Sequence, residues 1–92
     1  MKHLKAWTKI FKALANENRL KILYCIDRNG ELSVKMISDK ISRGVKITSK
    51  HLNILARTDI LEANGKLGSV WYSINPDIRA EIKYIVTKFI RQ

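Results

Sequence analysis

The stretch SVKMISDKISRGVKITSKHLNILAR, residues 33–57, decides the fold of this 92-residue chain. In its first part, Val34, Ile37 and Ile41 recur at spacings of three and four, which predicts a short helix with one apolar face. Ser33 precedes the run and can cap the helix by accepting a backbone N–H. A Ser-Arg-Gly tripeptide, typical of a tight turn, separates this run from a second periodic run. The stretch therefore predicts two helices joined by a short turn, the helix-turn-helix arrangement.

The second run predicts a helix over residues 45–57 with two different faces. Its inward positions follow the helical spacing and are Val45, Thr48, Leu52 and Leu55. Its outward positions are mostly polar or basic and are Lys46, Ile47, Ser49, Lys50 and Asn53. The segment from Lys40 to Arg57 holds five basic residues and no acidic residue, so positive charge is concentrated here.

Two further helices are predicted before this motif. One is expected over residues 2–15, where large apolar residues form a helical stripe: Leu4, Trp7, Phe11 and Leu14, widened by Ile10. Asn16 is expected to cap the next helix, because its side-chain oxygen can accept an otherwise unpaired backbone N–H. That helix is expected to close at Gly30, since glycine fits the left-handed position past a helix end.

A β-hairpin and a last helix are predicted after the motif. The strands are expected at about 61–63 and 69–74, joined around Asn64-Gly65, a common hairpin signal. Asn75-Pro76-Asp77 is typical of a helix start, which predicts a helix over residues 76–91. The chain is thus expected to be one domain, 1–92, mainly α with a small β-hairpin wing. This α+β plan, with five helices and two strands, is a winged helix-turn-helix.

The charge of the chain narrows its function. Eighteen Lys and Arg against eight Asp and Glu give a net charge of +10, which indicates a polyanionic partner, nucleic acid first and an anionic membrane second. No apolar run approaches the ~20 residues that span a bilayer, so a soluble, cytoplasmic protein without a membrane partner is expected. The single cysteine, Cys25, excludes an internal disulfide and any multi-cysteine metal site. No nucleophile–base pairing or phosphate-binding glycine loop is present, and we expect no enzyme activity and no cofactor.

Four pieces of the chain, in order, resemble the ArsR-type (arsenic-repressor) family of winged-helix transcriptional regulators. They are FKALANENRLKIL (11–23), GELSVKMIS (30–38), SKHLNIL (49–55) and GSVWYSI (68–74). The resemblance covers about residues 8–75. It implies a DNA-binding regulator in which 45–57 is the recognition helix and the hairpin is the wing.

The resemblance also implies that Lys46, Ser49 and Lys50 face DNA. Their chemistry agrees, because Lys donates to guanine or phosphate, and Asn53 could read adenine while Ile47 could touch a thymine methyl. Outside this helix, phosphate contacts are expected from Lys40, Arg43 and, in the wing, Lys66. The sequence departs from the family by having Lys46 where a small hydroxyl residue is usual, and Val45 and Ile47 where Gln and Thr are common. Several members also carry two or three Arg in the wing, where this chain has only Lys66.

Metal binding is common in the family, but the ligand positions are altered here. One family site uses cysteines that correspond to Ser33 and Lys35, and a Lys ammonium repels a cation. The other uses carboxylates and histidines of the last helix, where this chain offers only Asp77 and Glu81. We therefore expect no metal. Cys25 is most simply a buried small apolar residue, with a redox-sensing thiol as the alternative.

The first and last helices carry more apolar surface than one small domain is expected to cover. As in the resembling family, they are expected to form the interface of a homodimer, through Leu4, Trp7, Phe11, Ile82, Ile85 and Phe89. The function expected from the sequence is a homodimeric, sequence-specific double-stranded DNA-binding regulator, acting as a repressor on an inverted-repeat operator. Open alternatives are a protein- or RNA-interaction module on the same scaffold, a nonspecific architectural DNA-binding protein, and a metal- or thiol-gated sensor of unorthodox type.

Overall fold

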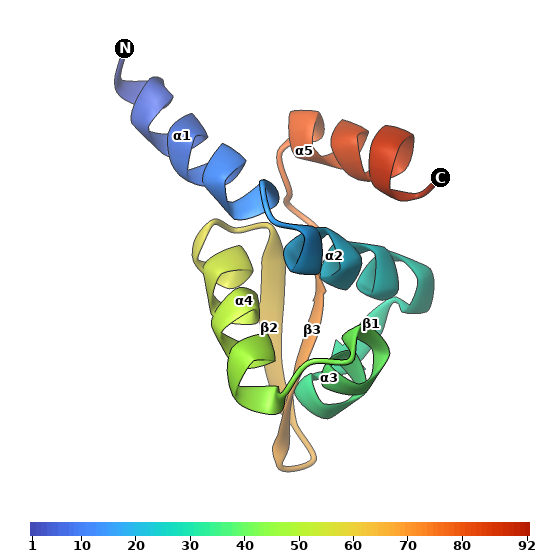
Figure 1. Cartoon of the computed structure of the whole chain (residues 1–92). Helices are drawn as coiled ribbons and strands as arrows, with labels where there is room; N and C mark the ends of the chain where they lie inside the picture. The colour runs from blue at the N-terminus through green and yellow to red at the C-terminus, as the bar shows by residue number, and fades with distance from the viewer.

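The computed structural model describes the backbone of residues 1–92 and the side chains of all of them except Lys2. Over this described chain, five α-helices surround a three-stranded antiparallel sheet (Figure 1). The elements are α1 (Lys2–Leu14), α2 (Glu17–Asn29), β1 (Glu31–Ser33), α3 (Val34–Ile41), α4 (Val45–Arg57), β2 (Leu61–Lys66), β3 (Ser69–Ile74), α5 (Ala80–Ile85) and a π-helical continuation of α5, η1 (Val86–Ile90). The predicted mainly helical, winged helix-turn-helix fold class is confirmed.

The helix boundaries around the central motif follow from local capping. The Asn16 side chain accepts the N–H of Arg19 at 3.1 Å, and the Ser33 hydroxyl accepts the N–H of Met36 at 3.3 Å. Gly30 ends α2 with φ of +84°, a conformation that side chains disfavour. Both predicted caps and the predicted stop are therefore confirmed.

The sheet contains one strand that the sequence pattern did not predict. β1 joins the outer side of β3, with Glu31 opposite Ser73 and Leu32 opposite Tyr72, which gives the order β1-β3-β2. A strand of three residues is too short to show an alternating pattern. It exists because the distant β3 offers it a ladder of hydrogen-bond partners.

The hairpin turn lies further along than its strongest sequence signal. β2 continues through Asn64 and Gly65, which pair with Trp71 and Val70 of β3. The chain reverses instead at Leu67 and Gly68, which have φ of +53° and +75° as two-residue hairpin turns require. The prediction of a strand ending at Ala63 was therefore wrong, because cross-strand pairing along β3 determined the register.

The last helix begins later than predicted. The Asn75 side chain accepts the N–H of Asp77 at 2.9 Å and donates to the carbonyl of Asp59 at 3.0 Å, so it holds a turn. The chain leaves the sheet through this turn, and α5 starts only at Ala80. The predicted start at Pro76 was wrong, since Asn75 caps a turn tied to the α4–β2 connection rather than a helix.

The core is built around α2, whose Ile22, Leu23 and Ile26 are fully buried. α4 contributes the fully buried Thr48, Leu52 and Leu55, as its predicted inward stripe required. The predicted fourth member of that stripe, Val45, is instead 48% exposed, because the first turn of α4 extends beyond the core.

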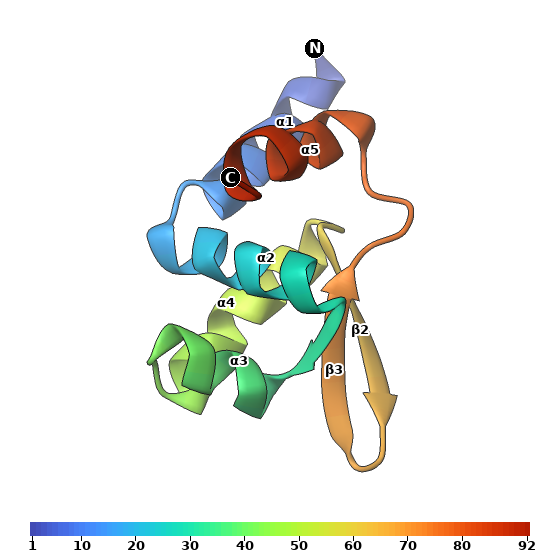
Figure 2. The same cartoon turned by 90° about the vertical axis from the view of Figure 1, so that its right-hand side faces the viewer.

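The molecule has two ends with different contents. In both ribbon views α1 and α5 lie at one end and the tip of the β2–β3 hairpin lies at the opposite end (Figures 1 and 2). The N-terminal turn of α4 lies in the half of the molecule that holds the hairpin tip. We call these the helical end and the hairpin end.

Candidate nucleic-acid interface

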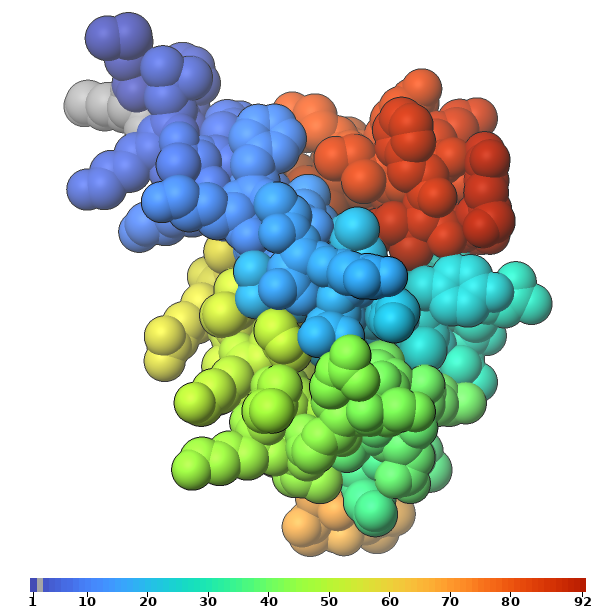
Figure 3. Space-filling model, viewed as in Figure 1, coloured from blue at the N-terminus to red at the C-terminus, as the bar shows by residue number. Residues whose placement is uncertain are grey.

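The outward face of α4 is open to solvent, as predicted. Lys46, Ile47, Lys50 and Asn53 are exposed, whereas Ser49 is half-buried at the edge of the face. In the space-filling view, side chains of α3 and α4 form the lower front of the molecule and long side chains of α4 project at its left edge (Figure 3). Because three fully buried residues on the other side seat the helix in the core, this face has a fixed orientation.

The basic residues of this face keep their charge free of carboxylates. Among the described side chains, the ion pairs are Lys35–Asp39, Lys66–Glu31 and Arg91–Asp27. Lys46 and Lys50 occur in none of these pairs. Their ammonium groups therefore remain available to a polyanion on the N-terminal half of the outward face of α4.

Two more exposed basic residues precede α4: Lys40 in the last turn of α3, and Arg43 in the turn between α3 and α4. Ser38 donates its hydroxyl hydrogen to the Arg43 carbonyl, and Ser42 adopts a left-handed conformation with φ of +55°. The Arg43 guanidinium donates to the Ser42 carbonyl at 3.0 Å. The turn is thus a defined structure that places Arg43 beside the start of α4, with Lys40 at the end of α3 before it.

The hairpin offers less free charge than its sequence suggested. The Lys66 ammonium forms an ion pair with Glu31 of β1 and lies 5.1 Å from the centre of the Trp71 ring. The carboxylate that neutralises Lys66 comes from the strand that sequence reasoning missed. Lys66 would have to leave this partner to contact a phosphate.

Arg19 links α4 to α1, and sequence reasoning missed this role. Its guanidinium donates to the carbonyls of Ala13 and Lys12, at 2.6 and 3.0 Å, and approaches the Nδ1 atom of His51 at 3.1 Å. Since guanidinium only donates, His51 Nδ1 must accept, which defines a neutral tautomer. Burial, and secondly the Arg19 charge, lowers the pKa of His51 below its ordinary value. The signal for this link was present in the sequence only as an arginine three residues after a helix cap.

At the helical end, α1 and the C-terminal helix expose large apolar side chains. Leu4, Phe11 and Phe89 of the predicted interface are 51%, 57% and 71% exposed, and Tyr84, which was not predicted, is 57% exposed. Trp7 and Ile85 are half-buried. Ile82 is only 1% exposed and belongs to the core of the single chain, so it has almost no surface to offer a partner.

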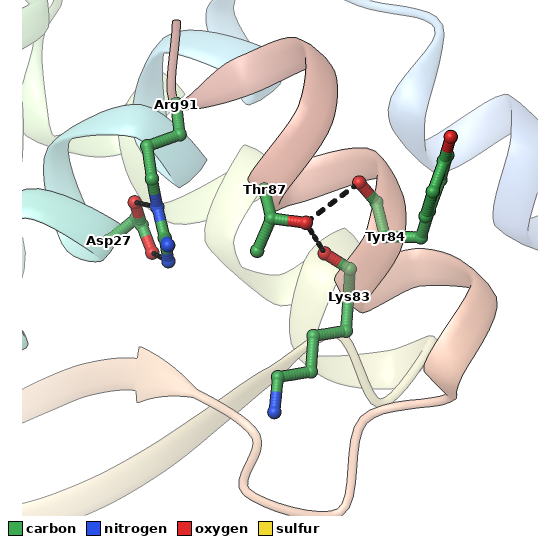
Figure 4. A network of polar contacts seen from close by, with 5 residues as sticks. All are labelled: Asp27, Lys83, Tyr84, Thr87 and Arg91. Carbon is green, nitrogen blue, oxygen red and sulfur yellow. Dashed lines mark hydrogen bonds and ion pairs between the residues drawn. The ribbon is translucent and has the colours of Figure 1, made fainter.

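Polar contacts hold the C-terminal helix in place (Figure 4). Arg91 donates two hydrogen bonds to the carboxylate of Asp27 on α2, at 2.9 and 3.0 Å. These bonds outweigh the effect of burial and lower the pKa of Asp27. Thr87 donates to the carbonyls of Lys83 and Tyr84 within the helix. The exposed aromatic face is therefore attached to the same helix, α2, that forms the centre of the core.

The described side chains include no group of three His, Cys, Asp or Glu residues that could hold a metal ion. Ser33 uses its hydroxyl as the α3 cap, and Lys35 pairs with Asp39 at 3.2 Å. Cys25 is half-buried rather than fully buried, and it lines a shallow apolar hollow of about 450 Å³ together with Ile41. Within the described chain, none of the helices is both long and apolar enough to cross a bilayer.

Known proteins are similar to this chain in both sequence and fold. No protein-family model matches the chain. The homodimeric winged helix-turn-helix DNA-binding domain of a possible ArsR-family transcriptional regulator from Mycobacterium bovis superposes with a TM-score of 0.80, at 27% identity over 91% of this chain and 77% of that one. The cadmium resistance transcriptional regulatory protein CadC homolog of Staphylococcus aureus is 32% identical over 85 residues, which span 91% of this chain and 68% of that regulator. This chain belongs to the ArsR-type family of winged-helix transcriptional regulators.

A third relative agrees with this family membership. The transcriptional activator HlyU of Vibrio cholerae is 31% identical over 77 residues, which cover 83% of this chain and 70% of the activator. The structure of reduced HlyU has a TM-score of 0.76 and covers 96% of this chain and 93% of its own. As a member of this family, the chain is a DNA-binding transcription regulator.

Proposed function

We propose that this ArsR-type regulator works as a cytoplasmic homodimer that binds an inverted-repeat operator in duplex DNA and represses transcription. The observation that carries the proposal is the exposed basic face of α4, on which Lys46 and Lys50 have no carboxylate partner among the described residues. A repressor needs no contact beyond the operator, because a bound dimer blocks the promoter by occupying it.

In this proposal α4 enters the major groove, which is ~12 Å wide and accepts one helix. Lys46 and Lys50 contact guanine or phosphate, and Asn53 reads a base edge beside them. Ser49 contributes from the border of the face. Lys40 and Arg43 contact phosphates next to the groove and position the helix without reading sequence. Lys66 contributes less, because Glu31 competes for its charge.

The dimer forms through the helical end. Phe11 and Phe89 are exposed aromatic side chains there, and burying such groups is the main favourable contribution to association. Leu4, Trp7, Ile85 and Tyr84 complete the proposed contact surface. A two-fold axis through the helical end points two α4 helices toward DNA, and half-sites one helical turn apart, ~34 Å, suit such a pair. The homodimeric domain from Mycobacterium bovis supports this arrangement.

The experiment compares binding to a selected operator with binding to random duplex over a range of salt concentrations. Six to eight neutralised phosphates predict a slope of about −5 to −7 in a plot of log affinity against log salt. The variant Lys46→Glu with Lys50→Glu is expected to lose at least about 100-fold in affinity. The matched control, Lys5→Glu with Lys21→Glu, makes the same change in net charge on exposed side chains outside α4 and the turn before it. It is expected to lose less than about 10-fold.

The alternatives give different results in the same experiment. Equal affinity for the selected and random duplexes would indicate a nonspecific architectural protein. Duplex binding that Lys46→Glu with Lys50→Glu leaves unchanged would remove α4 from the interface. Absence of duplex binding by the unsubstituted protein would favour a protein- or RNA-interaction module. The sign of regulation is read from a promoter–reporter fusion, in which loss of the regulator is expected to raise expression.

A further inference from the structure

The first turn of α4 carries two exposed aliphatic side chains in the middle of a basic surface. Val45 is 48% exposed and Ile47 is 51% exposed, on either side of Lys46. The periodic pattern assigned Val45 to the core, so its exposure is a finding of the structure. Single exposed apolar residues are common on proteins, and the position of these two is what makes them informative.

Residues at the N-terminal end of a helix in the major groove are the ones that reach base edges. An aliphatic group there can neither donate nor accept a hydrogen bond. The one feature of the groove that complements it is the C5-methyl group of thymine. Both side chains are β-branched and therefore have few rotamers, so they would lose little conformational freedom on contact.

The helical geometry separates the two side chains. Successive residues are ~100° apart around an α-helix, so Val45 and Ile47 point in directions roughly 160° apart, and Lys46 lies ~100° from each. They cannot both contact the same methyl group. Each would meet a different base pair, on the two sides of the position that Lys46 faces.

From this geometry we infer that Val45 and Ile47 each contact a thymine methyl, so that every operator half-site carries thymine at two base pairs beneath the first turn of α4. The inference rests on the proposed function and adds a class of DNA sequence to it. Neither side chain belongs to the buried core: Val45 begins the stripe that Thr48 and Leu52 continue but is 48% exposed at the first turn, and Ile47 is 51% exposed.

The test begins with selection of binding sites from a randomised duplex library by the full chain. Thymines in the selected half-site are then replaced one at a time by uracil, which removes only the methyl group. At two positions per half-site the replacement is expected to weaken binding about 3- to 10-fold, as for loss of one buried methyl contact. In Val45→Ala one of these positions becomes insensitive to uracil, and in Ile47→Ala the other does.

Ile54→Ala is the matched control, because Ile54 is also exposed on α4 but lies in its C-terminal half. This variant should keep full sensitivity to uracil at both positions. If uracil has no effect anywhere in a half-site that the protein still prefers over random duplex, the inference is wrong and the proposed function stands. Uracil sensitivity that persists in both alanine variants would also overturn it. If no sequence is preferred, the proposed sequence-specific function itself fails.

Discussion

The recognition helix α4 and the β2–β3 hairpin both carry basic residues, but these residues differ in burial of their supporting element and in whether a carboxylate neutralises them. α4 is seated by fully buried side chains and keeps its lysines free of carboxylates among the described residues. At the hairpin tip Leu67 is 94% exposed, and the neighbouring Lys66 is paired with Glu31. A lysine's availability to phosphate therefore depends on what the fold places beside it, and this chain concentrates free charge on the helix rather than on the wing.

The largest expected effect is a loss of operator affinity when the lysines of α4 are removed, compared with removal of the hairpin lysine. Lys46→Ala with Lys50→Ala should weaken operator binding by about 100-fold and make the log–log salt slope of the dimer less negative by about 3 to 4. Lys66→Ala should leave the slope within about one unit and cost less than about threefold. Fluorescence anisotropy at several salt concentrations measures both. Equal losses of affinity from the α4 and hairpin substitutions would show that the free charge is not concentrated on α4.

The next effect concerns the support of α4. Arg19→Ala removes the link between the end of α1 and His51, and charged hydrogen bonds of this kind contribute about 2 kcal/mol. The free energy of unfolding, measured by urea denaturation, should fall by roughly that amount. Lys21→Ala, an exposed neighbour on the same helix, should change it by less than about 0.5 kcal/mol. If Arg19→Ala leaves the free energy of unfolding unchanged, the buried residues of α4 alone hold that helix in place.

The third prediction tests whether Glu31 limits the contribution of the hairpin to DNA binding. Glu31→Gln removes the carboxylate that pairs with Lys66, so the ammonium becomes free for a phosphate. Operator affinity should rise about threefold and the salt slope should become more negative by about 1 to 2 in the dimer. Adding Lys66→Ala should cancel the gain. A gain in affinity that persists after this second substitution would come from the loss of a negative charge in general, and not from Lys66.

A smaller effect is expected from pH. The pKa of His51 lies below its ordinary value of 6.5 in the folded state, because burial and Arg19 disfavour the imidazolium. Well above pH 6.5 His51 is neutral in both the folded and the unfolded state and contributes no pH dependence. As the pH falls below that value, His51 binds a proton in the unfolded state but not in the folded state. The free energy of unfolding therefore decreases until the pH passes the pKa of His51 in the folded state. His51→Gln should flatten this part of the stability curve, measured by denaturation at each pH; an unchanged curve would assign the dependence to other groups.

The smallest effect is expected from metal ions. Ser33 and Lys35 occupy the places of family ligands and already cap a helix and pair with Asp39. Adding Cd²⁺ or Zn²⁺ should therefore change operator affinity less than about twofold. A larger change that Cys25→Ser abolishes would reveal a thiol-based site; one that persists in Cys25→Ser would point to carboxylate or histidine ligands.

Much of the fold and of the candidate interface was predictable because it depends on nearby residues. The caps at Asn16 and Ser33 and the buried positions Leu52 and Leu55 follow from spacings of three or four residues. The predictions failed where a distant partner intervened. Asn75 resembled a helix cap, but its side chain bonds to Asp59 and holds a turn.

The sequence by itself determined the order of the helices and the hairpin, the helix-turn-helix with its basic face, and the resemblance to the family, since periodicity, capping and charge are local properties of a chain. Only the tertiary structure decided which of these features remain available to a partner. It added β1 beside β3, gave Lys66 its carboxylate, placed Ile82 in the core and left Val45 exposed. Each of these outcomes depends on contacts between residues far apart in the chain, which no short-range pattern encodes.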